Sequence, residues 1–131
     1  MKLPAWMRGA LLATAAMNLL GGVVFLPGAT ALRALVGLPE GHPPLYLATV
    51  AAFILIFGCA YLWSGATGFA APQFLVVGAA GKLAFFGLLV WSWTEGAVPG
   101  VVPLAGIGDL AFGLACMAYL LTVLPDARRA P

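Results

Sequence analysis

Three polar side chains, Asn18, Lys82 and Asp109, stand inside long apolar stretches of this sequence and could do chemistry there. An amine and a carboxylate in an apolar environment form an ion pair, which can hold a polar ligand, relay a proton or fix two helices together. Asn18 adds an amide that both donates and accepts hydrogen bonds. Such residues are conspicuous because, of 131 residues, 63% are hydrophobic and only 8% are charged.

This composition excludes several classes of protein. Soluble domains are roughly half apolar and about one quarter charged, and disordered chains need low hydrophobicity. Six Lys+Arg against four Asp+Glu give a net charge of +2 without a basic stripe, so nucleic acid is not an expected partner. We therefore expect one integral membrane domain over residues 1–131, surrounded by membrane lipids.

The charge-free stretches predict an all-α protein with four membrane-spanning helices, because a span needs about 20 mostly apolar residues. Proline is tolerated only in the first turn of a helix, and prolines fall at the four proposed starts and inside none of the spans. We expect an up-down four-helix bundle. Its helices are predicted at residues 5–26, 44–64, 73–94 and 102–124.

An outer loop, residues 27–43, connects the first two spans. Leu32, Leu35 and Val36 repeat there at helical spacing ahead of Gly37, which predicts a short interfacial helix that ends at this glycine. An irregular loop is the alternative.

The cations predict the orientation, since Lys and Arg near the ends of spans stay on the cytoplasmic side. Lys2, Arg8, Arg128 and Arg129 fall on one side of the predicted bundle, and only Arg33 falls in a connection on the other. We expect both termini in the cytoplasm and the protein in the cell (inner) membrane.

The polar residues of the spans are predicted to meet near mid-membrane. A rise of 1.5 Å per residue places Asn18 and Asp109 about 20 Å, and Lys82 about 13 Å, from the cytoplasmic end. We expect a Lys82–Asp109 ion pair with Asn18 bonded to Asp109, and Thr14 lies one turn before Asn18 on the same face. Helical side chains lean towards their own N-terminus, which widens the vertical gap of about 7 Å between the pair. The alternatives are that these groups only fix helix register, or that Lys82 extends to the cytoplasmic interface.

Glu40, His42 and Glu95 are candidates for a weak cation or proton site at the outer surface, with solvated loop residues as the alternative. A single histidine and two isolated cysteines provide no metal-binding motif. The sequence also contains no nucleophile elbow, P-loop or dinucleotide fingerprint. It therefore identifies no catalytic residue and implies no cofactor by motif, although lipid or quinone binding stays open.

Short motifs extend over most of the chain: Gly37-Leu38-Pro39 before Tyr46, Gly58 with Tyr61, Val77-Gly78 to Gly81-Lys82-Leu83, and Gly108-Asp109-Leu110 with Phe112. In these motifs and in its size and layout, the chain resembles small bacterial four-helix membrane proteins of the DoxX-like group. The resemblance implies a membrane-embedded accessory subunit of a quinone-linked oxidoreductase.

These observations favour a non-catalytic membrane subunit or a module that binds a lipophilic ligand at the buried polar cluster, with a partner subunit or a second copy as possible protein partners. One alternative is a small proton-coupled or ion transporter that uses the Lys82–Asp109 pair. Another is an accessory of a lipid- or quinone-linked membrane enzyme.

Overall fold

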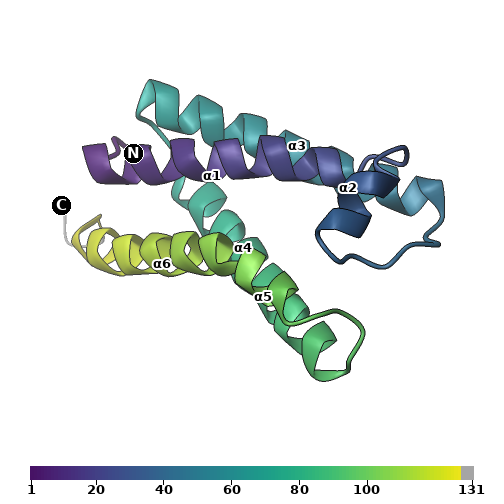
Figure 1. Ribbon diagram of the computed structural model, residues 1–131. Coiled ribbons are helices and arrows are strands. Elements are labelled where there is room, and N and C mark those ends of the chain that lie inside the picture. The colour runs from purple at the N-terminus through teal and green to yellow at the C-terminus, as the bar shows by residue number, and fades with distance from the viewer. Residues whose placement is uncertain (128–131) are drawn as a thin grey trace.

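The computed structural model describes residues 1–127, with side chains through residue 123, and this part of the chain is all helical. Pro44 and Pro72 occupy first turns of long helices, as predicted from the sequence. The helices, labelled in Figure 1, are α1 (Ala5–Val24), α2 (Thr30–Leu35), α3 (Pro44–Thr67), α4 (Pro72–Thr94), α5 (Val101–Ala105) and α6 (Ile107–Ala127).

The second span is longer than predicted, because α3 does not end at Ser64-Gly65. Gly65 instead lets α1 approach closely, since a Cβ atom there would lie 2.9 Å from Leu12 Cγ. The helix ends at Gly68, whose φ of +75° is the left-handed conformation that glycine adopts without strain.

The predicted fourth span, 102–124, is broken into α5 and α6 at Gly106. The N–H of Gly106 bonds to Pro103 and that of Asp109 bonds to Gly106, so both bonds reach three residues back instead of four. Gly106 also sits against α4, where a Cβ atom would lie 2.7 Å from Leu89 Cδ1. The break makes a new helix start within the predicted fourth span.

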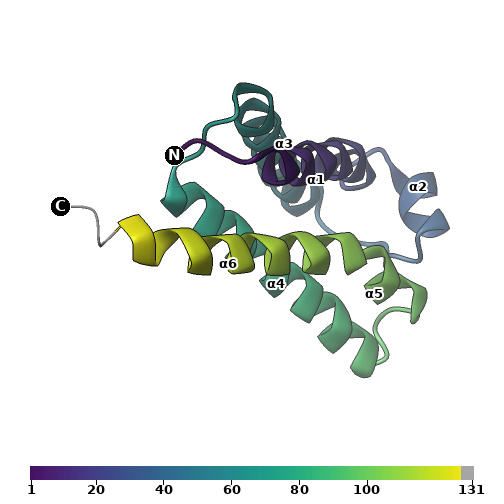
Figure 2. The same cartoon turned by 90° about the vertical axis from the view of Figure 1, so that its left-hand side faces the viewer.

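The long helices pack as two pairs, α1 with α3 and α4 with α6. The backbones of the two pairs approach each other mainly at α1 and α6. The consecutive helices α3 and α4 contact each other through side chains, as Tyr61 does with Phe74 and Gly78. Figures 1 and 2 show that the pairs diverge away from the N-terminus. The arrangement is therefore more open than the predicted up-down bundle.

One end of the molecule, here called the terminal end, is tied together by the first residues of the chain. Residues 1–3 pair with residues 68–70 of the α3–α4 turn, with 2.8 Å between Leu3 N and Gly68 O. The Arg8 guanidinium donates to the carbonyls of Gly65 and Ala66 at 3.0 and 3.1 Å, which neutralises the C-terminus of α3.

The buried apolar core is concentrated towards this terminal end and draws on α1, α3, α4 and α6. Its members are Leu3, Met7, Leu11, Ala15, Tyr61, Ala70, Leu75, Ala79, Phe112, Cys116, Tyr119 and Leu120.

The opposite end, here called the loop end, is organised by Arg33 of α2, and this short helix confirms the one predicted in the outer loop. The buried Arg33 guanidinium donates to the carbonyls of Val24, Leu26 and Pro27 at 2.7–3.2 Å, which lie at the C-terminus of α1 and just after it. It also pairs with the Glu40 carboxylate at 3.2 Å. Arg33 therefore caps α1 and fixes the loop that follows.

Large apolar side chains cover the outside of every long helix. Leu20, Trp63, Leu88 and Leu121 are each more than half exposed, and a soluble protein does not expose apolar surface on this scale. Three helices, α1, α3 and α4, are long and apolar enough to cross a bilayer, and α6 carries a shorter apolar stretch. The chain is a small helical membrane protein.

Two adjacent glycines of α1 test how tightly the α1–α3 pair is packed. A Cβ atom on Gly22 would lie 2.8 Å from Leu55 Cδ2, whereas one on Gly21 has nothing within 4 Å. We expect Gly22→Leu to lower the free energy of unfolding in detergent by about 1–3 kcal/mol, because it overpacks the helix contact. Gly21→Leu is the matched control, and equal losses in the two variants would contradict the packing.

Substitutions of Arg33 test how much its hydrogen bonds stabilise the loop end. Arg33→Lys keeps the positive charge but loses the planar set of five donors, so we expect it to lower the free energy of unfolding by about 1–3 kcal/mol. Hydrogen exchange should become faster in the last turn of α1. Glu40→Gln should lower the free energy of unfolding by less than Arg33→Lys does, because Glu40 is half exposed and the amide oxygen still accepts a hydrogen bond. If Arg33→Lys leaves the free energy of unfolding unchanged, the guanidinium donors are dispensable and the prediction fails.

Candidate functional site

Lys82 of α4 connects the two helix pairs. Its ammonium Nζ donates hydrogen bonds to Asn18 Oδ1 on α1 and to Asp109 Oδ1 on α6. The side chains of Lys82 and Asp109 are 11% and 10% exposed, so both partners of this ion pair lie inside the molecule. The structure therefore brings together the three polar residues that the sequence places at mid-membrane.

Asn18 extends this network to α3, since its Nδ2 donates to the carbonyl of Ile54 at 3.1 Å. Gly58 makes that approach possible, because a Cβ atom there would already lie 3.1 Å from Asn18 Cβ. The network of Asn18, Lys82 and Asp109, here called the polar cluster, thus reaches all four long helices. The predicted bond between Asn18 and Asp109 is wrong, because Asn18 accepts from Lys82 instead.

Asp109 occupies the first turn of α6, and not the middle of one continuous helix as expected. The break at Gly106 produces this placement. The free N–H groups of a helix N-terminus carry partial positive charge, so the start of α6 stabilises the Asp109 carboxylate in addition to Lys82. The Lys82 side chain reaches Asp109 despite the expected vertical gap, and it does not extend to the membrane surface.

A cavity of about 440 Å³ lies against the polar cluster. Its polar lining side chains are Asn18, Tyr61, Lys82 and Asp109, and the other lining residues are apolar or glycine. Pockets that hold small molecules have about 300–1,000 Å³ and are mostly apolar with a few polar groups, which is the pattern here.

Apolar side chains line the cavity at both ends of the molecule. Towards the terminal end it meets the buried core at Tyr61. Towards the loop end it is lined by Val36 and Leu38 from the segment after α2. Between them, Gly37 has a φ of +75° and packs against the α4–α5 connection, where a Cβ atom would lie 2.8 Å from Pro99 Cγ.

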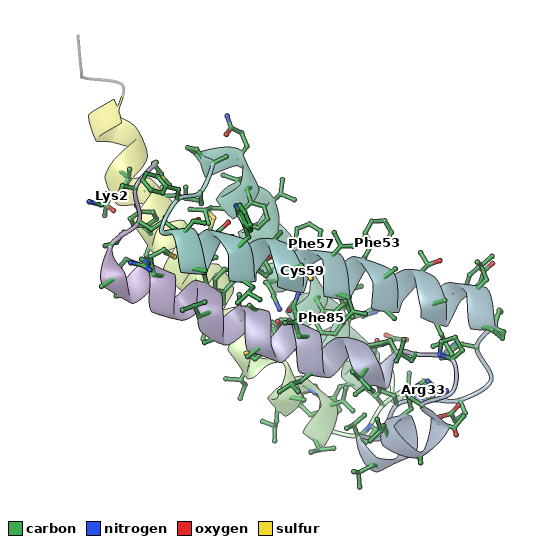
Figure 3. The ribbon with its side chains drawn as sticks, turned by 90° about the horizontal axis from the view of Figure 1, so that it is seen from above. Lys2, Arg33, Phe53, Phe57, Cys59 and Phe85 are labelled. Carbon is green, nitrogen blue, oxygen red and sulfur yellow. The ribbon has the colours of Figure 1, made fainter. Side chains whose placement is uncertain are left out.

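The two long sides of the cavity differ. On the α1–α6 side, Gly108 leaves space for the Met17 side chain, and the polar cluster joins the helices. On the α3–α4 side the cavity-lining residues Phe53 and Val77 are 62% and 55% exposed. Figure 3 shows Phe53 and Phe57 on the edge of α3 that faces away from α1. The cavity therefore opens sideways, between α3 and α4.

An apolar groove of about 340 Å³ adjoins this opening and shares Phe57 and Val77 with the cavity. Its remaining lining residues are Ile56, Ala60, Gln73 and Phe74. The cavity and the groove therefore border each other at Phe57 and Val77, between α3 and α4.

Comparison with protein-family models, with curated proteins and with solved structures finds no match for this chain. The chemistry of the site follows from its donors and acceptors. Lys82 and Asp109 carry opposite charges. Asn18 is hydrogen-bonded to Lys82 and to the carbonyl of Ile54. Tyr61 contributes a hydroxyl group to the same cavity. The arrangement can hold a polar head group at one end and an apolar body along the rest.

Tyr61 was not among the candidate residues, although it lines the cavity and is 2% exposed. Its ring packs between Phe74 and Phe112, both with centroids at 5.3 Å. Gly78 makes room for the hydroxyl, since a Cβ atom there would lie 2.7 Å from it. The sequence provides little signal for it, because Tyr61 lies in the last turn of the predicted span 44–64, where an interfacial tyrosine is the ordinary expectation.

Thr14 does not join the polar cluster. It is buried, its hydroxyl has no hydrogen-bond partner among the described residues, and it does not line the cavity. Thr14 lies one helical turn before Asn18 on α1, and at this position it is part of the buried core between the polar cluster and the terminal end.

The outer-surface candidates do not form a common site either. Glu40 is held by Arg33, whereas His42 and Glu95 are exposed. Among the described residues, no three histidine, cysteine, aspartate or glutamate side chains are grouped so that they could hold a metal ion. The structure does not group these three side chains, and Glu40 pairs with Arg33, which the sequence suggested only for orientation.

The ion pair leads to a double-mutant prediction. Lys82→Met leaves the Asp109 charge buried without its partner, and Asp109→Leu does the same to Lys82, so each should lower the free energy of unfolding by about 3–5 kcal/mol. The double variant Lys82→Met/Asp109→Leu should recover most of this loss, because an apolar pair of similar volume replaces the charges. Unfolding in one detergent measures all three. Additive losses would show that the two side chains are not coupled.

Proposed function

We propose that this membrane protein binds a lipophilic small molecule in the cavity between its two helix pairs, without catalysing a reaction on it. The observation that carries the proposal is the cavity of about 440 Å³ with apolar walls and the polar cluster at one side. Folding around such a space leaves apolar side chains without packing partners, a cost that a bound apolar molecule removes.

The shape of the cavity supports uptake from the bilayer. Both ends are lined by apolar side chains, from the core at the terminal end and from Val36 and Leu38 at the loop end. The α3–α4 side is the open one, and its exposed rim residues Phe53 and Val77 face the apolar surroundings of the helices. A lipophilic molecule can therefore pass from the hydrocarbon into the cavity between α3 and α4 without crossing water.

The core favours binding over proton or ion transport. A transport path needs polar groups or water on both sides of the Lys82–Asp109 pair. In the described part of the chain, the space between this pair and the terminal end is filled by Met7, Leu11 and Leu75, which are fully buried. The ion pair lies at the inner wall of a lateral cavity, where it can serve as a recognition group.

The proposed topology has four crossings with both termini in the cytoplasm. The break at Gly106 leaves α5 and α6 as successive parts of the fourth crossing, as in the discontinuous helices that border binding sites in membrane proteins. Lys2 and Arg8 lie at the terminal end, which supports its cytoplasmic placement. Arg128 and Arg129, which contributed to the predicted orientation, lie outside the described residues.

Two glycines of α4 allow a matched test of the cavity. A Cβ atom on either Gly81 or Gly87 has nothing within 4 Å, but only Gly81 lines the cavity. Gly81→Leu should fill the space without disturbing the fold, because leucine also has the better helix propensity. In native mass spectrometry after mild-detergent extraction, the unmodified protein should retain one lipophilic molecule per chain. Gly81→Leu should reduce its occupancy about tenfold, which corresponds to roughly 1.4 kcal/mol of lost binding.

Gly87→Leu is the control and should retain the molecule as the unmodified protein does. The proposal fails if no molecule is retained by the unmodified protein. It also fails if Gly81→Leu and Gly87→Leu retain the same amount, since binding would then lie outside the cavity.

A further inference from the structure

The polar cluster has hydrogen-bonding capacity that the fold does not use. A lysine ammonium has three donors, of which Asn18 and Asp109 take two. Asp109 accepts at Oδ1, whereas Oδ2 has no hydrogen-bond partner among the described residues, and the same is true of the Tyr61 hydroxyl. One donor of Lys82, one acceptor of Asp109 and the Tyr61 hydroxyl are therefore available beside one cavity.

The charge of the cluster selects the kind of head group. Lys82 and Asp109 are paired, so the site as a whole carries no net charge. A carboxylate or ammonium head would bring in a charge for which the cavity provides no free counter-ion, and an unpaired charge is strongly disfavoured in apolar surroundings. An alkane, in contrast, would leave the available donors and acceptor unsatisfied.

A hydroxyl group matches both conditions. It is uncharged, its oxygen can accept hydrogen bonds from Lys82 and Tyr61, and its hydrogen can be donated to Asp109 Oδ2. The apolar part of such a molecule would lie along the apolar walls and leave towards the groove shared by Phe57 and Val77.

Building on the proposed lipophile binding, we propose that the cavity selects an uncharged, hydroxyl-bearing lipophile, with Lys82, Asp109 and Tyr61 as the residues that recognise the hydroxyl. Selectivity lies in the head group, because the walls that contact the tail are apolar and do not distinguish one saturated chain from another.

The test is a series of ligands that share one chain: tetradecanol, its methyl ether, tetradecane, tetradecanoic acid and tetradecylamine. Each is added at the same mole fraction to nanodiscs that hold the unmodified protein, and bound ligand is counted by native mass spectrometry. We expect tetradecanol to bind at least about tenfold better than tetradecane and about fivefold better than the ether, which cannot donate to Asp109. The acid and the amine should bind less than the alcohol.

Two variants assign the effect to residues. Tyr61→Phe removes only an oxygen that has no partner in the fold, and it should lower the preference for tetradecanol over tetradecane about fivefold while tetradecane binding stays the same. Tyr46→Phe makes the same change at an exposed position outside the cavity and should have no effect. Asp109→Asn leaves Lys82 unneutralised, so its preferred ligand should become tetradecanoic acid.

The outcomes separate this inference from the function on which it rests. If all five compounds bind equally well, and Gly81→Leu blocks them all, the cavity binds lipophiles but the hydroxyl selectivity is wrong. Preference of the unmodified protein for the acid or the amine would also overturn it. If no compound binds, or if Gly81→Leu leaves binding unchanged, the proposed function itself fails.

Discussion

The rest of the structure depends on one buried ammonium group. Lys82 is the point at which the α4–α6 pair is joined to the α1–α3 pair at mid-depth, through Asp109 on one side and Asn18 on the other. Apolar packing within a membrane gives little preference for one helix arrangement over another, because lipid tails are as apolar as the helices. A charge that must find its partners supplies that preference, and it keeps two diverging helix pairs in a defined relation.

The molecule divides between a packed half and an open half. At the terminal end the first residues of the chain, Arg8 and the apolar core hold the helices together. At the loop end the pairs separate, and the segment after α2 bridges them through Gly37. The polar cluster lies at the boundary between the halves. A chain of this size can therefore contain a small-molecule cavity in a bilayer without losing the contacts that hold it together.

Much of the architecture was predictable because apolar run length and proline placement act locally. They predicted the starts of α3 and α4, the short helix of the outer loop, and the three residues of the polar cluster. The break at Gly106 was missed because the surrounding residues are as apolar as the rest of the predicted span, and the close approach of Gly106 to α4 depends on a distant part of the chain. The hydrogen-bond pattern of Lys82 and the place of Tyr61 depend on how the pairs diverge, which no local pattern specifies.

The Arg33 contacts have a consequence for the order in which the protein assembles. All of the partners of Arg33 lie between Val24 and Glu40, at most nine residues away along the chain. Such contacts close short loops and can form as soon as this segment has been synthesised. The bonds of Lys82, in contrast, join residues 64 and 27 positions apart, and the bond to Asp109 requires the last helix. The contacts of the loop end can thus form early, whereas the space between the α1–α3 and α4–α6 pairs takes its final shape only after α6 has been synthesised and packed.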